Sequence, residues 1–160
     1  MKTLSRRAFM AAALALTLNL LPLNIAMAHE ADCPYCKQPV TQDTATQDNE
    51  VVLKYGRKRI EYKCVYCALA EAKTEYKSGD ISIAAPSEKK GEPVIVKRTG
   101  GNWSATPSTA VFVAQTPIKH RSCQVTARAF RTKGAAESYI KANNLKSQPI
   151  SLSQLVSLAK

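Results

Sequence analysis

The chain has 160 residues, with 23 Lys or Arg against 12 Asp or Glu, so its formal net charge at pH 7 is +11. This length excludes a large multidomain enzyme and leaves room for one domain or two very small ones. A hydrophobic content of 45% with 22% charged residues is ordinary for a folded protein and argues against a disordered chain.

Residues 1–28 predict a cleavable export signal. They hold no acidic residue, and a basic start leads into an apolar run that ends in the small-residue pattern Ala-Met-Ala at 26–28. The run is too short, and too interrupted by Asn and Pro, for a membrane span. Arg6-Arg7, followed by Ala and Phe, is typical of a twin-arginine signal. We therefore expect a periplasmic protein that is not membrane-spanning after signal cleavage.

Residues 29–79 predict the first of two small strand–strand–helix units. After a first cysteine pair and a polar linker, residues 51–55 predict a strand, with a turn at Gly56 and a return strand at 59–63. A helix is expected to begin at residue 64, to run through residue 72 and to end near Ser78-Gly79. The second cysteine pair would then lie in the first turn of that helix.

Residues 80–160 predict a second α+β unit packed on the first. Short strands are expected at 81–83, 94–96, 111–113 and 125–130. Thr132 predicts the N-cap of a helix that reaches Asn143, and Ser151 with Gln154 has the capping-box spacing before a last short helix. Because both units combine strands and helices, the expected fold class is α+β.

Two Cys-x-x-Cys pairs predict a soft-metal site formed by Cys33, Cys36, Cys64 and Cys67. Four thiolates in pairs suit a tetrahedral zinc or copper(I) ion. A knuckle (the turn between Cys33 and Cys36), then a hairpin, then a helix carrying the second pair is typical of a treble-clef zinc finger. Backbone N–H groups at the helix N-terminus would favour the thiolates of Cys64 and Cys67. We expect a metal-handling accessory protein, copper chaperone-like or a zinc-stabilised module, and not an enzyme.

Two other uses of these cysteines remain open. Exported cysteines often form disulfides. A thiol–disulfide oxidoreductase using Cys64 and Cys67 is the alternative from another class, although no thioredoxin-like strand–helix–strand pattern precedes them. The first pair has the Cys-Pro-Tyr-Cys tetrapeptide of glutaredoxins, but residues 37–41 are poor helix formers. The chain has no Gly-x-Ser-x-Gly sequence and no phosphate loop, so hydrolase and nucleotide functions find no support.

Three more residues are candidate additional ligands. His120 and Cys123, three positions apart, could form a second soft-metal half-site that converges with the four cysteines. The alternative is a surface histidine and a buried lone thiol. His29 would become the first residue after signal cleavage, and its amine and imidazole together could chelate copper(II).

Several stretches carry a family resemblance: residues 36–40, residues 59–72, and a C-terminal run at 127–130, 134–140 and 149–155. In them the chain resembles the NosL-type copper-binding accessory proteins associated with nitrous oxide reductase maturation. The resemblance implies two small strand–strand–helix units and exported copper(I) binding, with a copper-enzyme apoprotein as partner.

The chain departs from that family at its metal motif. The family's Cys-Gly-Met is Cys36-Lys37-Gln38 here, so only the cysteine carries over. No methionine follows Met27, so the exported chain offers copper(I) no thioether. The metal chemistry is therefore judged on the four cysteines themselves.

The basic hairpin over residues 54–59 is typical of a surface that meets an acidic partner. A zinc finger with such a hairpin would ordinarily indicate nucleic acid binding, but export argues for no nucleic acid. An acidic periplasmic protein, anionic lipid headgroups and a merely solvated hairpin tip are the readings left open.

Overall fold

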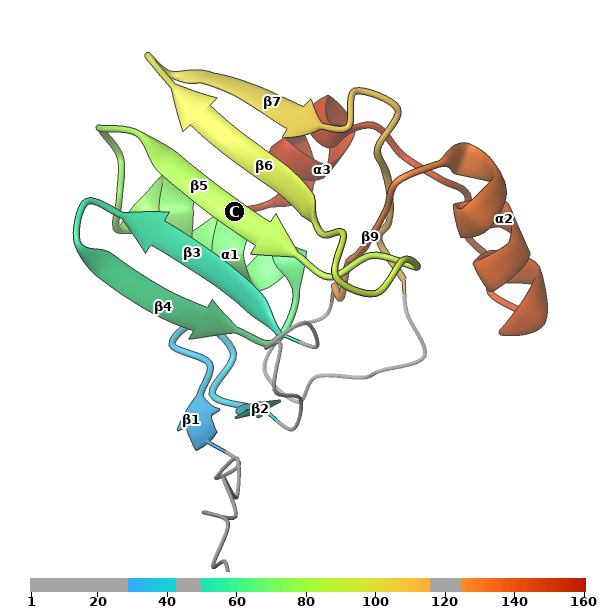
Figure 1. Cartoon of the computed structure of the whole chain (residues 1–160), viewed down its shortest axis with the longest axis horizontal. Coiled ribbons are helices and arrows are strands. Elements are labelled where there is room, and N and C mark those ends of the chain that lie inside the picture. Colours follow the sequence, from blue (N-terminus) through green and yellow to red (C-terminus); the bar gives the residue numbers. More distant parts are fainter. Residues whose placement is uncertain (1–28, 43–49, 116–124) are drawn as a thin grey trace, which may run out of the picture.

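The computed structural model describes residues 29–42, 50–115 and 125–160 (Figure 1). These residues form an α+β fold with antiparallel sheets and helices, so the predicted class is confirmed. The expected export signal, residues 1–28, lies outside them. Within the described ranges, no helix has the length and apolar character needed to cross a membrane.

A five-stranded antiparallel sheet forms the centre of the fold. Its strands, in spatial order, are β4 (Lys58–Tyr62), β3 (Val51–Tyr55), β5 (Ile81–Ala85), β6 (Val94–Thr99) and β7 (Asn102–Thr106). The β3–β4 turn is made by Gly56, whose φ of 57° is the left-handed conformation that glycine adopts readily. Strand β7 was not predicted, because its sequence, Asn-Trp-Ser-Ala-Thr, has too few apolar residues to stand out.

The two expected units share this one sheet. Strand β3 pairs with β5 through Leu53 and Ile83, so strands from both sides of residue 79 are hydrogen-bonded neighbours. The expected boundary is a turn at Gly79, where φ is +81° and a Cβ would lie 3.0 Å from the ring of Tyr55. Strands β5, β6 and β7 of the second unit therefore extend the first unit's sheet.

Helix α1 (Val65–Thr74) packs on one face of the sheet, against β3, β4 and β5. Its C-terminal end is held by Arg98, which is buried and donates hydrogen bonds to the carbonyls of Ala72, Ser78 and Gly79. The bond to Ala72 satisfies a carbonyl group that the helix end leaves without an intrahelical partner, and the bonds to Ser78 and Gly79 hold the connection that follows the helix. Arg98 thereby joins β6 to the helix that carries the second cysteine pair.

A smaller two-stranded sheet, β8 (Val111–Val113) and β9 (Arg128–Phe130), precedes α2 (Lys133–Ala142) and α3 (Leu152–Leu158). The predicted caps are confirmed: the Thr132 side chain accepts from the N–H of Ala135, and Ser151 forms a capping box. Strand β9 was expected from residue 125 but begins at Arg128. The reason is that β8 ends at Val113, the partner of Arg128, so earlier residues have no ladder to join.

Candidate metal centre

The first cysteine pair lies in the turn of a short hairpin, β1 (His29–Asp32) and β2 (Pro39–Gln42). The N–H of Lys37 donates to the carbonyl of Cys33 at 2.8 Å, and the N–H of Cys33 donates to the carbonyl of Gln38 at 2.9 Å. Lys37 has a φ of 55°, which closes this tight turn. The expected knuckle is therefore present, and the two strands that hold it were not predicted.

The second pair lies at the start of α1, as the sequence predicts. Cys64 is the N-cap residue with extended backbone, and its side chain makes no capping hydrogen bond. Cys67 follows within the first helical turn, and the order of knuckle, hairpin and helix matches the treble-clef outline. Both thiols are thus close to N–H groups that the helix leaves free.

The sulfur atoms from the two pairs converge. Those of Cys33, Cys36 and Cys67 all lie within 4.8 Å of one another, and the Cys64 sulfur lies 3.4 Å from that of Cys67 without joining the three-sulfur group. The relative exposures of Cys33, Cys36, Cys64 and Cys67 are 0%, 0%, 8% and 0%.

None of the four cysteines is part of a disulfide, and the 3.4 Å between the sulfurs of Cys64 and Cys67 is far beyond the roughly 2.05 Å of a disulfide bond. No disulfide therefore joins the described cysteines.

The donor set fits a soft metal. Four thiolates at zinc–sulfur distances of about 2.3 Å stand about 3.8 Å apart in a tetrahedron. The three-sulfur group and the Cys64–Cys67 separation bracket that spacing. Cys33, Cys36 and Cys67 are thus grouped closely enough to share one ion, and Cys64 contacts this group through Cys67.

The electrostatics of the cluster favour thiolates on two of the four residues. The pKa of Cys33 is lowered to about 5, chiefly because the Cys67 thiol hydrogen-bonds to it, with burial opposing. The pKa of Cys64 is lowered, again chiefly by the Cys67 thiol. The pKa of Cys67 is raised by those same two hydrogen bonds, and burial raises the pKa of Cys36 to about 11. Cys67 thus shares its proton with two thiolates, the form that binds metal.

The C-terminal end of the chain lies against the cysteine motifs. Tyr35 and Tyr66 occupy the third position of each Cys-x-x-Cys, and their hydroxyls donate to the carbonyls of Lys160 at 3.0 Å and Leu158 at 3.4 Å. Lys73, on α1, donates to the carbonyl of Val156 at 3.0 Å. This C-terminal cover, formed by residues 156–160, was not predicted from the sequence. The repeated tyrosine at the third motif position was the one available signal.

The described part of the structure shows none of the additional ligand candidates at the site. His120 and Cys123 lie outside the described ranges, so their convergence stays a prediction. The chain does return to the cluster just after them, because the backbone of Ala127 hydrogen-bonds to the Cys64 sulfur. His29 is the first residue of β1, paired across the ladder with Gln42, and its side chain is not described.

Comparison with known proteins finds one fold relationship of note. No family model matches the chain, and no curated protein matches its sequence. The fold is similar to that of MerB2, in a crystal structure of its mercury-bound form, with a TM-score of 0.54 and 18% sequence identity. The match covers 68% of this chain and 55% of the MerB2 chain, so the protein spans about half the length of MerB2. At this identity, the similarity concerns the fold alone.

Proposed function

We propose that this chain is a metal-binding accessory protein that holds one soft metal ion through Cys33, Cys36, Cys64 and Cys67. The convergence of three buried sulfurs within 4.8 Å, from motifs separated by residues 37–63, carries the proposal. A buried thiolate set binds zinc and copper(I) in preference to hard cations such as magnesium or calcium. The mercury-bound MerB2 structure adds that a protein of similar fold takes up a soft metal.

Two features point to different metals at this site. Near-complete burial of all four cysteines is typical of a zinc ion held for stability. The NosL-type resemblance and the export signal favour copper(I) that is received and passed on to a copper-enzyme apoprotein. In the zinc role the metal stabilises the fold, and in the copper(I) role it is an ion that the protein transfers.

Export shapes how the site would be filled. A twin-arginine signal implies that the protein crosses the membrane already folded. Its thiols would then meet their metal in the reducing cytoplasm, before they reach the oxidising periplasm. Bound metal would also protect both Cys-x-x-Cys pairs from forming internal disulfides there.

The second candidate function is thiol–disulfide exchange at Cys64 and Cys67. The lowered pKa of Cys64 and its place as the N-cap of α1 favour it. Its exposure of 8% opposes it, because an exchange reaction needs an accessible attacking sulfur. Turnover in an insulin-reduction assay that is abolished by Cys64→Ser would replace the metal role with a redox role.

Elemental analysis of the purified exported form tests the metal role directly. We expect about one equivalent of zinc or copper per chain, lost in Cys33→Ser and Cys67→Ser. Tyr139→Phe, on α2, is the control, and Cys123→Ser shows whether the chain's fifth thiol contributes to binding. Metal below a tenth of an equivalent, with all five thiols open to titration, would contradict the proposal.

Metal competition then separates the two roles. Copper(I) that displaces zinc and moves to an acceptor apoprotein supports transfer. Zinc that resists copper(I), and whose removal by a chelator unfolds the protein, supports a structural role.

A further inference from the structure

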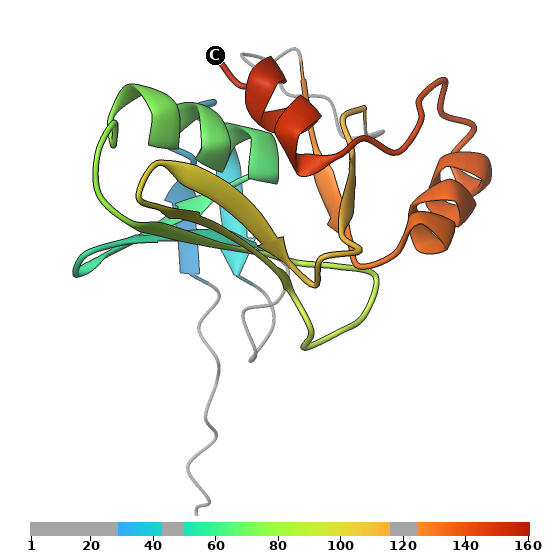
Figure 2. The same ribbon diagram turned by 90° about the horizontal axis from the view of Figure 1, so that it is seen from above.

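The face of the five-stranded sheet that points away from α1 carries a row of positive charge. In Figure 2, α1 and α3 lie on one side of this sheet. Leu53, Ile83 and Val96 are paired neighbours on the α1 side, and all three are buried. Since side chains alternate along a strand, the next residues, Lys54, Ser82 and Lys97, face the other way.

These outward residues are in register across the sheet. Arg59 pairs with Lys54, Lys54 with Ser82, and Ser82 with Lys97. With strands about 4.8 Å apart, Lys54 and Lys97 are separated by about 10 Å. The three cations therefore form one line that crosses β4, β3, β5 and β6.

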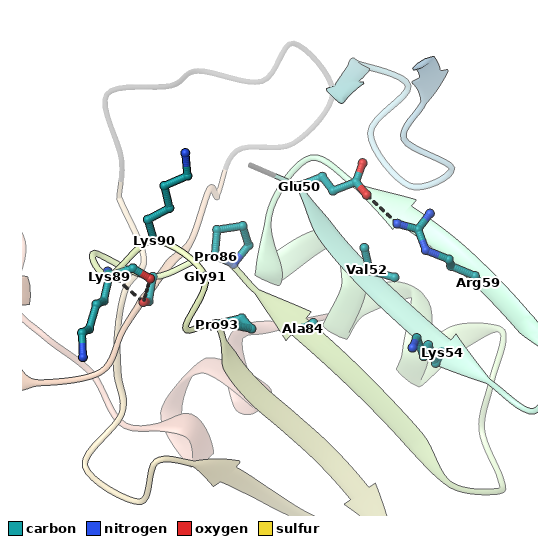
Figure 3. A pocket seen from close by; sticks show the side chains of 11 residues that line it. Glu50, Val52, Lys54, Arg59, Ala84, Pro86, Lys89, Lys90, Gly91 and Pro93 are labelled. Carbon is teal, nitrogen blue, oxygen red and sulfur yellow. Dashed lines mark hydrogen bonds and ion pairs between the residues drawn. The ribbon is translucent and has the colours of Figure 1, made fainter. Parts of the chain in front are cut away.

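A pocket of about 380 Å³ opens on this face beside the row, between the sheet and the β5–β6 connection (Figure 3). Its apolar lining comes from Val52, Ala84, Pro86 and Pro93. Its charged lining consists of four cations and one carboxylate: Lys54, Arg59, Lys89, Lys90 and Glu50. The pocket is thus apolar in its floor and basic in its surroundings.

Only part of this positive charge is neutralised within the protein. Arg59 forms ion pairs with Glu50, at 2.8 Å, and with Glu61. Lys89 pairs with Glu92, in an exposed ion pair that solvent weakens. Over the described ranges, by contrast, Lys54, Lys90 and Lys97 are exposed and have no acidic partner.

We propose that this face docks an acidic segment of a partner protein, with carboxylates on Lys54, Lys90 and Lys97 and one apolar side chain in the pocket. Charge complementarity supplies the attraction and speeds the encounter. In an extended chain, side chains on one face recur every two residues, so carboxylates four residues apart stand about 14 Å apart. The long Lys54 and Lys97 side chains, which start about 10 Å apart, can reach this span by leaning outward. A planar array of lipid headgroups could meet the lysines, but it would leave the apolar pocket unfilled.

This docking goes beyond the metal role and does not depend on it. The cysteine cluster belongs to the knuckle and to α1, which covers the opposite face of the sheet. A partner held here would leave the thiols and their C-terminal cover uncontacted. Metal content and partner binding can therefore fail independently.

Fluorescence anisotropy with a labelled peptide tests the proposal. The probe is a short peptide with glutamates four residues apart, a valine midway between them and glycines elsewhere, so that in an extended chain all these side chains share one face. Its controls replace glutamate by glutamine or valine by glycine. We expect binding that falls with rising salt. Lys54→Glu with Lys90→Glu should weaken it roughly tenfold, while Lys141→Glu with Lys146→Glu, an equal charge change elsewhere, should not.

A pocket-filling variant tests the apolar half of the site. Ala84→Leu should weaken binding of the glutamate–valine peptide and leave the glutamate–glycine peptide unaffected. Metal content is measured in every variant, so a loss of folding or of the cysteine site is seen separately.

Three outcomes would overturn the proposal: no peptide binding, equal losses in the two double variants, or equal affinity for the glutamine peptide. Phosphatidylglycerol vesicles test whether the face binds a membrane surface instead of a protein. Vesicle binding that depends on Lys54 and Lys90, without peptide binding, would assign the face to a membrane surface instead.

Discussion

Tyr35 and Tyr66 contact each other edge to face, with ring centroids 6.1 Å apart and planes inclined by 70°. Each is the third residue of a Cys-x-x-Cys pair, and each hydroxyl is bonded to a backbone carbonyl near the end of the chain. The two motifs are therefore joined by an aromatic contact as well as by their sulfurs. The backbone carbonyls of Leu158 and Lys160 therefore lie beside this aromatic contact.

The tyrosine hydroxyls should slow metal exchange. Tyr35→Phe with Tyr66→Phe keeps the ring contact and removes both hydrogen bonds to the C-terminal cover. We expect metal transfer to a chromophoric chelator to become a few-fold faster, since each bond contributes about 1 kcal/mol. Tyr139→Phe, on α2, is the matched control. An unchanged transfer rate in the double variant would show that the cover does not limit release.

Cys67 should be the most sensitive of the four thiols. Its sulfur belongs to the three-sulfur group and also contacts Cys64, so its loss disconnects the two parts of the cluster. Cys67→Ser should lower metal affinity more than Cys64→Ser, by at least roughly tenfold. Competition titration with a chelator of known affinity measures this order. Equal losses in the two variants would mean that all four sulfurs ligate equivalently.

Thiolate absorbance of the metal-free protein should rise in separated steps with pH. The pKa of Cys33 is lowered to about 5 and that of Cys36 is raised to about 11, on either side of the ordinary value of 9.0. Cys67→Ala removes the hydrogen bond that lowers the Cys33 pKa, so the titration step of Cys33 should move to higher pH. A single transition near pH 9 in the unsubstituted protein would contradict this arrangement.

The same shift has a consequence for stability. Because the Cys33 pKa lies below its unfolded value, its thiolate stabilises the folded state. That contribution is complete above about pH 9 and is lost as pH falls through about 5. Bound metal should be released over the lower part of this range, since protons compete for the sulfur. Metal retention after dialysis at stepped pH measures the effect.

Arg98 should be essential for stability. Arg98→Leu would leave the buried carbonyl of Ala72 without its donor and would remove the hydrogen bonds to the carbonyls of Ser78 and Gly79. We expect a loss of about 2–4 kcal/mol in the free energy of unfolding. Urea denaturation of the variant, with Lys97→Leu at the neighbouring exposed position as control, gives the value. A loss below 1 kcal/mol would show that water replaces the guanidinium.

The sequence predicted several local elements that depend only on neighbouring residues. Strand β3 has the predicted bounds, 51–55, because a short apolar run and a glycine turn define it locally. The caps at Thr132 and Ser151 were predicted because a side-chain oxygen needs only a backbone N–H two or three residues ahead. The placement of Cys64 and Cys67 at a helix start had the same local origin.

Tertiary structure decided what depends on distant segments. The pairing of β3 with β5 merged two expected units into one sheet, and the three residues of β8 set where β9 begins. The register of three strands, β3, β5 and β6, aligned Lys54 with Lys97, and the packing of α3 brought the chain end to Tyr35 and Tyr66. A sequence pattern specifies which face of a strand or helix is apolar, but not which partner covers it. That choice is made by the packing of the whole core, where burial of apolar area is collective and independent of separation along the chain.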